Sequence, residues 1–204
     1  MRYFVNKLPD YIEGAPVATV DENRWISYIQ RTLTKIKTRM PPSLENCDGG
    51  LYVGCAGVAY ALYRLALSET RTADMRQDLL TSAASYIEES LNYASRKSRD
   101  PPIAFLLGKG GILAVASLIY DQLQGRQAAA DELRKKYVEL ATMVCKPGDI
   151  LGHGSDELFV GRAGYLCGAL TLNAACKREV GRIALIAMLC NGIQLCKLDL
   201  FEKT

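Results

Sequence analysis

The sequence predicts an all-α protein built from repeated helical hairpins. Three segments share one pattern, in which a few apolar residues precede a glycine, two further residues and a second glycine, and an apolar run follows. These glycine pairs are Gly54 with Gly57, Gly108 with Gly111, and Gly161 with Gly164. The leading glycines are 54 and 53 residues apart, a period that suits two helices with their connections. No stretch of useful length alternates apolar and polar residues as a strand would.

A separate amphipathic helix is predicted over residues 21–40, before the first repeat. Asp21 can cap it, because a side-chain oxygen at this position accepts bonds from the first backbone N–H groups. One side of the helix is apolar at three- and four-residue steps, with Trp25, Ile29, Leu33 and Ile36. Two prolines at positions 41 and 42 end it.

The first repeat is predicted over about residues 50–100. Residues 58–67 are almost continuously apolar, as in a helix that is buried on most sides. After a polar break, an outer helix places apolar residues on one face, with Met75, Leu79, Ala83, Tyr86, Ile87 and Leu91.

The second and third repeats, about 105–146 and 157–204, follow the same plan. A buried helix is predicted over 112–123, and an outer helix follows with Leu133, Tyr137, Leu140 and Val144. In the third repeat, residues 181–200 can form a helix, although its apolar residues run around the whole circumference.

The glycine motifs supply the candidate site. Glycines three apart share one helix face and let a neighbouring backbone approach closely, and the first can adopt backbone angles that other residues avoid. If the inner helices stand side by side, their N-termini meet around one hollow that favours an anion or a thiolate. The residues predicted to line this cavity are Gly54, Cys55, Gly57, Gly108, Lys109, Gly111, Gly161, Arg162 and Gly164.

Three of these residues leave two interpretations open. Lys109 and Arg162 hold the same position in two motifs, where they either attract an anionic peptide to the cavity mouth or pair with an Asp or Glu. Cys55 holds that position in the first motif. Its thiol is either made more acidic by the helix N-terminus or packed as a small buried side chain.

Composition excludes several classes of protein. The net charge of +3 and the lack of a basic stripe with interleaved aromatics argue against nucleic-acid binding. The N-terminus has no apolar segment of a signal peptide, and the apolar run at 183–190 is too short to cross a membrane. The seven cysteines include no C-x-x-C pair, so we expect reduced thiols in a cytoplasmic protein.

The segments 50–57, 105–111 and 157–165, together with Arg2-Tyr3-Phe4-Val5-Asn6, resemble the first repeats of eukaryotic LanC-like (lanthionine synthetase C-like) proteins. The resemblance is nearest to the LanC-like 3 branch. It implies an α/α toroid of helical hairpins, with residues 1–204 forming one incomplete domain of about half a ring. The match weakens after about Lys177, so the sequence predicts a truncated form.

The resemblance also implies an activity. Family members bind glutathione and form thioethers by adding a thiol to dehydrated residues of a peptide or protein, and zinc held by two cysteines and a histidine activates the thiol. Arg2 matches an arginine near glutathione, where its guanidinium can hold a carboxylate through two parallel bonds. The only histidine, His153, adjoins no cysteine, so we expect no metal ligands, no zinc in this chain and no assigned catalytic residue.

An alternative is a non-catalytic helical-repeat module that binds glutathione or a protein. Such a module could self-associate through the open edge of the half ring. The resemblance further implies peripheral contact with the plasma membrane. A toroidal glycosidase is disfavoured, because one tryptophan and no carboxylate within the glycine motifs do not supply a sugar-binding acid pair.

Overall fold

The computed structural model describes residues 5, 7, 9–10, 12–14, 21–68, 73–96, 102–144 and 156–176. The chain divides into two compact units, Met1–Lys35 and Ile36–Thr204. Every regular element within the described residues is a helix, so the predicted all-α class is confirmed. None of these helices is long and apolar enough to cross a membrane.

Helix α1 (Glu22–Arg39) corresponds to the N-terminal helix predicted over residues 21–40. Its cap is formed as expected, since the Asp21 carboxylate accepts the backbone N–H groups of Asn23 at 3.0 Å and Arg24 at 3.3 Å. No residue of α1 is buried, and Trp25 is 55% exposed.

The first hairpin pairs α2 (Gly54–Ala66) with α3 (Ala73–Arg96), and a short 3₁₀ turn, η1 (Leu44–Asn46), precedes it. The buried face of α3 consists of Leu79, Leu80, Ala83, Ala84, Tyr86, Ile87, Ser90 and Ala94. The predicted apolar side of this helix is therefore mostly buried, but Met75 at its start is exposed and Leu91 is only half-buried.

The second hairpin pairs α4 (Lys109–Asp121) with α5 (Gln127–Glu139), and α6 (Ala141–Val144) adds one further turn. Residues 110–120 of α4 are all buried, as the continuous apolar sequence predicts. Helix α5 is mostly exposed and buries only Ala130, Leu133, Arg134 and Tyr137.

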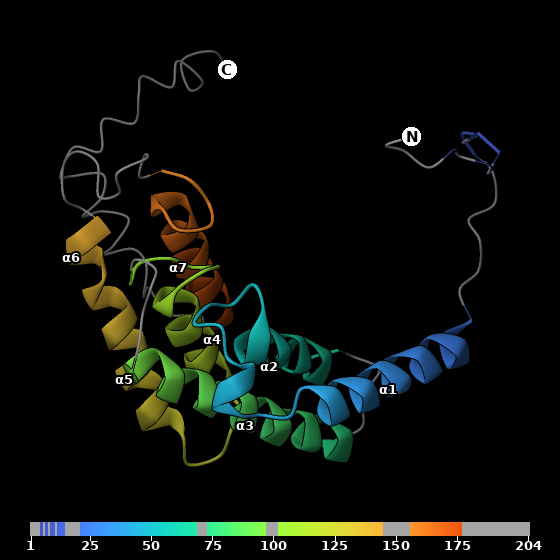
Figure 1. Ribbon diagram of the computed structural model, residues 1–204, viewed down its shortest axis with the longest axis horizontal. Coiled ribbons are helices and arrows are strands. Elements are labelled where there is room, and N and C mark those ends of the chain that lie inside the picture. Colours follow the sequence, from blue (N-terminus) through green and yellow to red (C-terminus); the bar gives the residue numbers. More distant parts are fainter. Residues whose placement is uncertain are drawn as a thin grey trace. The chain divides into compact units, whose positions relative to one another are not determined.

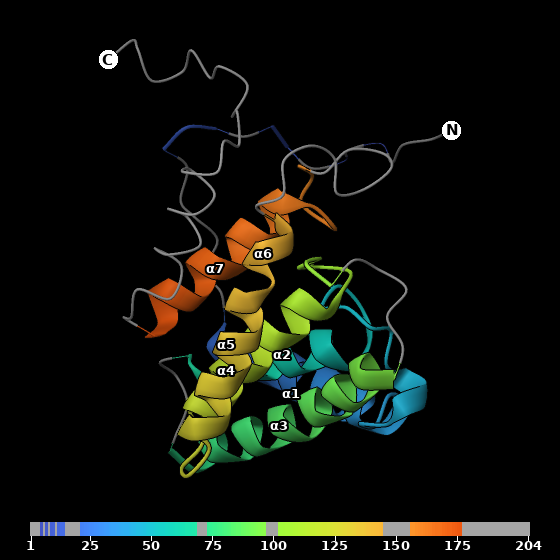
Figure 2. The ribbon, with the colours of Figure 1, turned by 90° about the vertical axis from the view of Figure 1, so that its left-hand side faces the viewer.

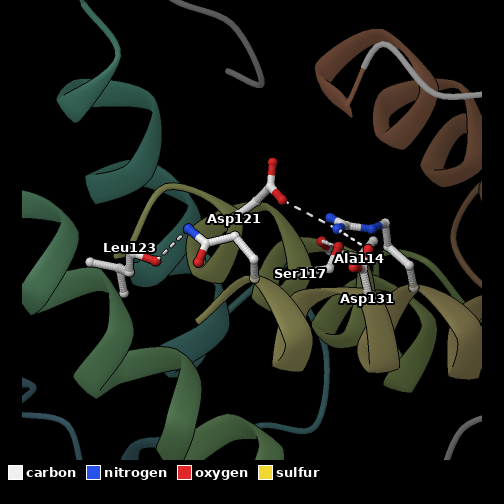
Figure 3. Close-up of polar contacts among 7 residues, drawn as sticks. Ala114, Ser117, Asp121, Leu123 and Asp131 are labelled. Carbon is white, nitrogen blue, oxygen red and sulfur yellow. Dashed lines mark hydrogen bonds and ion pairs between the residues drawn. The ribbon is translucent and has the colours of Figure 1, made fainter. Parts of the chain in front are cut away.

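Polar contacts hold the turn between α4 and α5 (Figure 3). The buried Arg134 side chain forms ion pairs with Asp121 at 3.2 Å and with Asp131 at 2.5 Å. The Gln127 side-chain amide donates to the carbonyl oxygen of Leu123 at 3.0 Å. The ion pair with Asp121 thus joins the end of α4 to the middle of α5, and the Gln127 bond joins the start of α5 to the turn.

Helix α7 (Arg162–Cys176) is the third inner helix. The buried α4 contacts α2, α3, α5 and α7, so it lies beside both other inner helices, α2 and α7 (Figures 1 and 2). The rings of Tyr137 and Tyr165 stack with centroids 4.7 Å apart, and the Tyr137 hydroxyl donates to the Tyr165 carbonyl at 2.5 Å. The helix predicted at 181–200 lies outside the described residues, and the bounds of the repeats stay predictions.

Candidate functional site

Three short loops lead into the inner helices and carry the first half of each glycine motif. Motif loop 1 is residues 51–53, motif loop 2 is residues 105–107, and motif loop 3 is residues 158–160. They precede α2, α4 and α7 respectively.

Backbone hydrogen bonds join the three motif loops to one another. The N–H groups of Leu51 and Tyr52 donate to the Leu106 carbonyl at 2.7 and 2.8 Å, and those of Leu106 and Leu107 donate to the Phe159 carbonyl at 3.3 Å. Tyr52, Leu106 and Phe159 hold the same position in their motifs, so the link from one loop to the next is repeated. The N-termini of the three inner helices therefore share one end of the molecule.

The second glycine of each motif packs against a backbone carbonyl. The contacts are Gly57 with Leu51, Gly111 with Phe105, and Gly164 with Leu158. A Cβ at Gly57 would approach the Leu51 oxygen to 2.9 Å, closer than any real Cβ contact. The packing interpretation of these glycines holds, but the approaching backbone is the helix's own motif loop and not a neighbouring helix.

The first glycine behaves differently from one motif to the next. Gly54 has φ +74°, which favours glycine, as the motif predicts. Gly108 has φ −147° and is extended, so that prediction is wrong in the second motif. The positive φ of Gly54 goes with its close packing on the preceding turn, where an added Cβ would lie 2.8 Å from the Asn46 oxygen and 3.0 Å from the Asp48 nitrogen.

Arg162 is 8% exposed, and its guanidinium contacts are structural. Its Nε donates to the Val144 carbonyl at 2.9 Å, and its Nη1 pairs with Asp156 at 2.9 Å. Of the two interpretations from the sequence, the pairing with a carboxylate is the one this residue adopts. Lys109, at the same motif position, is half-buried and forms no ion pair with any described residue.

Cys55 is 1% exposed, and its thiol donates to the Ser43 carbonyl at 3.6 Å. The small buried side chain is thus the interpretation that the structure shows. Arg2 and His153 lie outside the described residues, so their predicted roles stay predictions.

Glu157 has a role at motif loop 3 that was not predicted from the sequence. Its carboxylate accepts the backbone N–H groups of Val160, of Phe159 at 2.9 Å and of Gly161 at 2.9 Å. These bonds, with that from Val160 the strongest, lower the pKa of Glu157. An acidic residue shortly before a helix start is a capping signal that could have identified it.

Motif loops 1 and 3 also carry exposed apolar side chains. The exposed fractions are 63% for Tyr52, 46% for Val53, 45% for Leu158 and 41% for Phe159. The rings of Tyr52 and Phe159 meet edge to face with centroids 5.7 Å apart. A cluster of exposed apolar groups on linked loops is typical of a binding surface.

A cleft of ≈ 400 Å³ lies at the opposite ends of the same inner helices. It is lined by Tyr60, Tyr63, Arg64, Leu67, Leu118, Thr171, Ala174 and Ala175. A second cleft of ≈ 300 Å³ is lined by Leu44, Glu45, Tyr93 and Arg96. None of the residues predicted to line a cavity borders either cleft, so the hollow at the glycine-motif end stays a prediction.

Within the part of the chain that the structure describes, no three His, Cys, Asp or Glu side chains are grouped so that they could hold a metal ion.

Comparison with known proteins relates this arrangement to one family. A model of the lanthionine synthetase C-like protein family matches residues 45–194. The chain is 30% identical over 154 residues to "Glutathione S-transferase LANCL1" of Danio rerio, which covers 73% of this chain and 33% of that protein. It is 32% identical over 129 residues to "LanC-like protein GCL1" of Arabidopsis thaliana, covering 62% and 28%. The matches thus span about a third of the length of these relatives.

Proposed function

Because this chain belongs to the lanthionine synthetase C-like protein family, we propose that it takes part in thioether formation between glutathione and a dehydrated peptide. The motif loops would be the surface on which the two reactants meet. A relative named as a glutathione S-transferase supports the choice of thiol. The observation that carries the proposal is the hydrogen-bonded series of motif loops, which puts three helix N-termini beside exposed aromatic side chains.

The helix N-termini supply the electrostatic part of the site. Each bears a partial positive charge that stabilises anions nearby, so α2 and α4 favour the carboxylates and the thiolate of glutathione. At α7 the Glu157 carboxylate already accepts the N–H groups that lead into the helix. In the reaction, the thiolate sulfur bonds to the β-carbon of a dehydroalanine, and the α-carbon takes up a proton. Nothing leaves, so the product has the combined mass of both reactants.

The exposed side chains supply the peptide-binding part. Tyr52 and Phe159 present apolar ring area that an extended peptide can cover. Arg2 is the residue that we assign to a glutathione carboxylate. Zinc bound by the family's ligand set would stabilise a thiolate, but the described residues offer no such set, so the roles that we assign to them are binding and orientation.

A second candidate is a binding module without catalysis. The exposed pair of aromatic rings on motif loops 1 and 3 favours it, because such a surface can hold a peptide or protein without any chemical step.

Calorimetry and mass spectrometry separate the two candidates. The full chain is titrated with glutathione and then incubated with glutathione and a dehydroalanine peptide. Thioether formation above the rate without protein supports the enzyme. Binding of glutathione or peptide without addition supports the module, and no binding of either overturns both.

Variants test the assigned surface. Replacing both Tyr52 and Phe159 by alanine is expected to weaken peptide binding about tenfold, because aromatic anchors carry much of the energy of such contacts. The control is Tyr28→Ala, which removes a 42% exposed tyrosine from α1 and should leave peptide affinity unchanged. Arg2→Ala is expected to weaken glutathione binding and to leave peptide binding as it was.

A further inference from the structure

Two free cysteines share one backbone acceptor just before α2. The thiol of Cys47 donates to the Ser43 carbonyl oxygen at 3.4 Å, and the thiol of Cys55 donates to the same oxygen at 3.6 Å. Cys47 follows η1, and Cys55 lies in the first turn of α2. Two sulfurs that converge on one oxygen are close neighbours, although eight residues separate them in sequence.

The backbone brings the same two positions together. A Cβ at Gly54 would come within 2.8 Å of the Asn46 oxygen and 3.0 Å of the Asp48 nitrogen, so the chain on both sides of Cys47 packs against the residue before Cys55. Gly54 allows this approach with its positive φ of +74°. Such proximity is what the short reach of a disulfide requires.

We propose that Cys47 and Cys55 form an intramolecular disulfide on exposure to a small oxidised disulfide, and that this bridge fixes motif loop 1. In the first step, the Cys47 thiolate attacks one sulfur of oxidised glutathione and releases one glutathione thiolate. In the second, the Cys55 thiolate attacks the Cys47 sulfur of the mixed disulfide and releases the other. The two cysteine thiols are oxidised, oxidised glutathione is reduced to two thiols, and these take up the two protons.

The order of the steps follows from access. Cys47 is half-buried and open to the oxidant, whereas Cys55 is 1% exposed. Burial raises the pKa of Cys47 to about 12, and the nearby Cys55 and Glu89 add to the increase while a bond from Ser90 opposes it. Since the thiolate is the nucleophile, this raised pKa slows the first step at neutral pH, and the attack becomes faster as the pH rises.

The bridge would act on the candidate binding surface. The ring that it closes contains the whole of motif loop 1, whose Leu51 and Tyr52 N–H groups bond to the Leu106 carbonyl. The disulfide lowers the conformational entropy of motif loop 1 in the state where its bonds to motif loop 2 are broken. It therefore favours the state in which these bonds are formed.

Peptide mapping of the full chain tests the bridge. The folded protein is treated with oxidised glutathione, and the remaining thiols are alkylated. Trypsin then releases one peptide, residues 40–64, that contains both cysteines. A second cleavage, before Asp48, divides this peptide between the two cysteines, so the two fragments separate unless a disulfide joins them. We expect the two fragments to stay joined, lighter by two hydrogens and without alkyl groups. Hydrogen exchange at residues 51–53 is expected to slow on oxidation and to recover on reduction.

Matched variants make the result decisive. Cys47→Ser and Cys55→Ser keep a donor for the Ser43 carbonyl and should abolish both the joined fragments and the slowed exchange. Cys167→Ser, which removes an exposed thiol of α7, should preserve both. Full alkylation of Cys47 and Cys55 in oxidised folded protein, while Cys167 carries glutathione, overturns the proposal. So does a mixed disulfide on Cys47 that Cys55 never resolves.

Discussion

Motif loops 1 and 2 differ from motif loop 3 in how their backbone N–H groups are satisfied. In the first two loops, the N–H groups of Tyr52 and Leu106 bond to a carbonyl of the following loop. In the third, the corresponding N–H of Phe159 bonds to the Glu157 carboxylate, and so do the two N–H groups after it. A side chain thus replaces the backbone acceptor that each earlier loop receives from its neighbour.

A second difference lies just after the first glycine. Arg162 is buried and joined to Val144 and Asp156, whereas Lys109 in the second motif has no ion pair with a described residue. The loop of the third motif is therefore fixed by hydrogen bonds and an ion pair of side chains, and the loops of the first two mainly by backbone hydrogen bonds. The sequence suggests three equivalent units.

The largest effect is expected where the backbone contact is tightest. Gly111→Ala would drive a Cβ into the Phe105 carbonyl group and to within 3.1 Å of the Leu51 Cβ. Because both neighbours belong to motif loops, we expect a loss of about 3 kcal/mol in the free energy of unfolding, measured by urea denaturation. Gly57→Ala, whose nearest contact is 2.9 Å, should cost less. Equal decreases in the unfolding free energy of both variants would mean that the first and second inner helices pack equally tightly against their motif loops.

Side-chain anchoring of the third motif is tested by Arg162→Met. This variant keeps most of the apolar stem but leaves the Val144 carbonyl without its donor, at an expected cost of about 2 kcal/mol in unfolding free energy. Lys109→Met is the matched variant and should change stability by less than about 0.5 kcal/mol. If the lysine variant is as unstable as the arginine variant, the contrast between the motifs is wrong.

The attachment of α7 to the preceding hairpin is tested by Tyr137→Phe. The ring stack with Tyr165 survives, but the Tyr165 carbonyl loses the buried hydroxyl that donates to it. We expect a decrease of about 1 kcal/mol in unfolding free energy. Tyr86→Phe removes a similar bond, to the half-buried Met40 carbonyl at 2.8 Å, and should cost less because water can replace it.

The smallest effect concerns Glu157 and depends on pH. Its pKa in the folded chain is lowered from the ordinary value near 4.5, so the stabilisation is fully present above that value. It is lost as the pH falls through the lower, folded value. Thermal unfolding of the protein and of Glu157→Gln should therefore differ at neutral pH and converge under acidic conditions. Glu139→Gln, at the exposed end of α5, should match the unsubstituted protein throughout.

Sequence periodicity was sufficient to predict the helices. The apolar run of α4 and most of the spaced apolar residues of α3 and α5 are buried, because burial on helical steps leaves a direct pattern in the chain. The outer helix predicted to include Leu140 and Val144 is interrupted, since α5 ends at Glu139 and Val144 belongs to α6. The three glycine pairs likewise predicted close backbone packing, since only glycine tolerates the contacts that Gly57, Gly111 and Gly164 make.

The linkage between motif loops could not be predicted in the same way. Backbone-to-backbone bonds such as that from Tyr52 to Leu106 place no demand on side-chain type, so they leave no trace in the sequence. The partners of Arg162 and Glu157 depend on loop geometry that is fixed only after folding. The extended backbone of Gly108 differs from that of Gly54 although the two glycine pairs are equally spaced, so no periodicity resolves it.

The loop series has a consequence for how such proteins diversify. The hydrogen bonds between the loops use main-chain atoms alone, so exchanging the side chains at Tyr52, Leu106 and Phe159 removes the ring contact of Tyr52 with Phe159 but none of these bonds. Single substitutions in the motif loops could therefore change which ligands the exposed side chains bind, while the backbone arrangement of the loops is conserved.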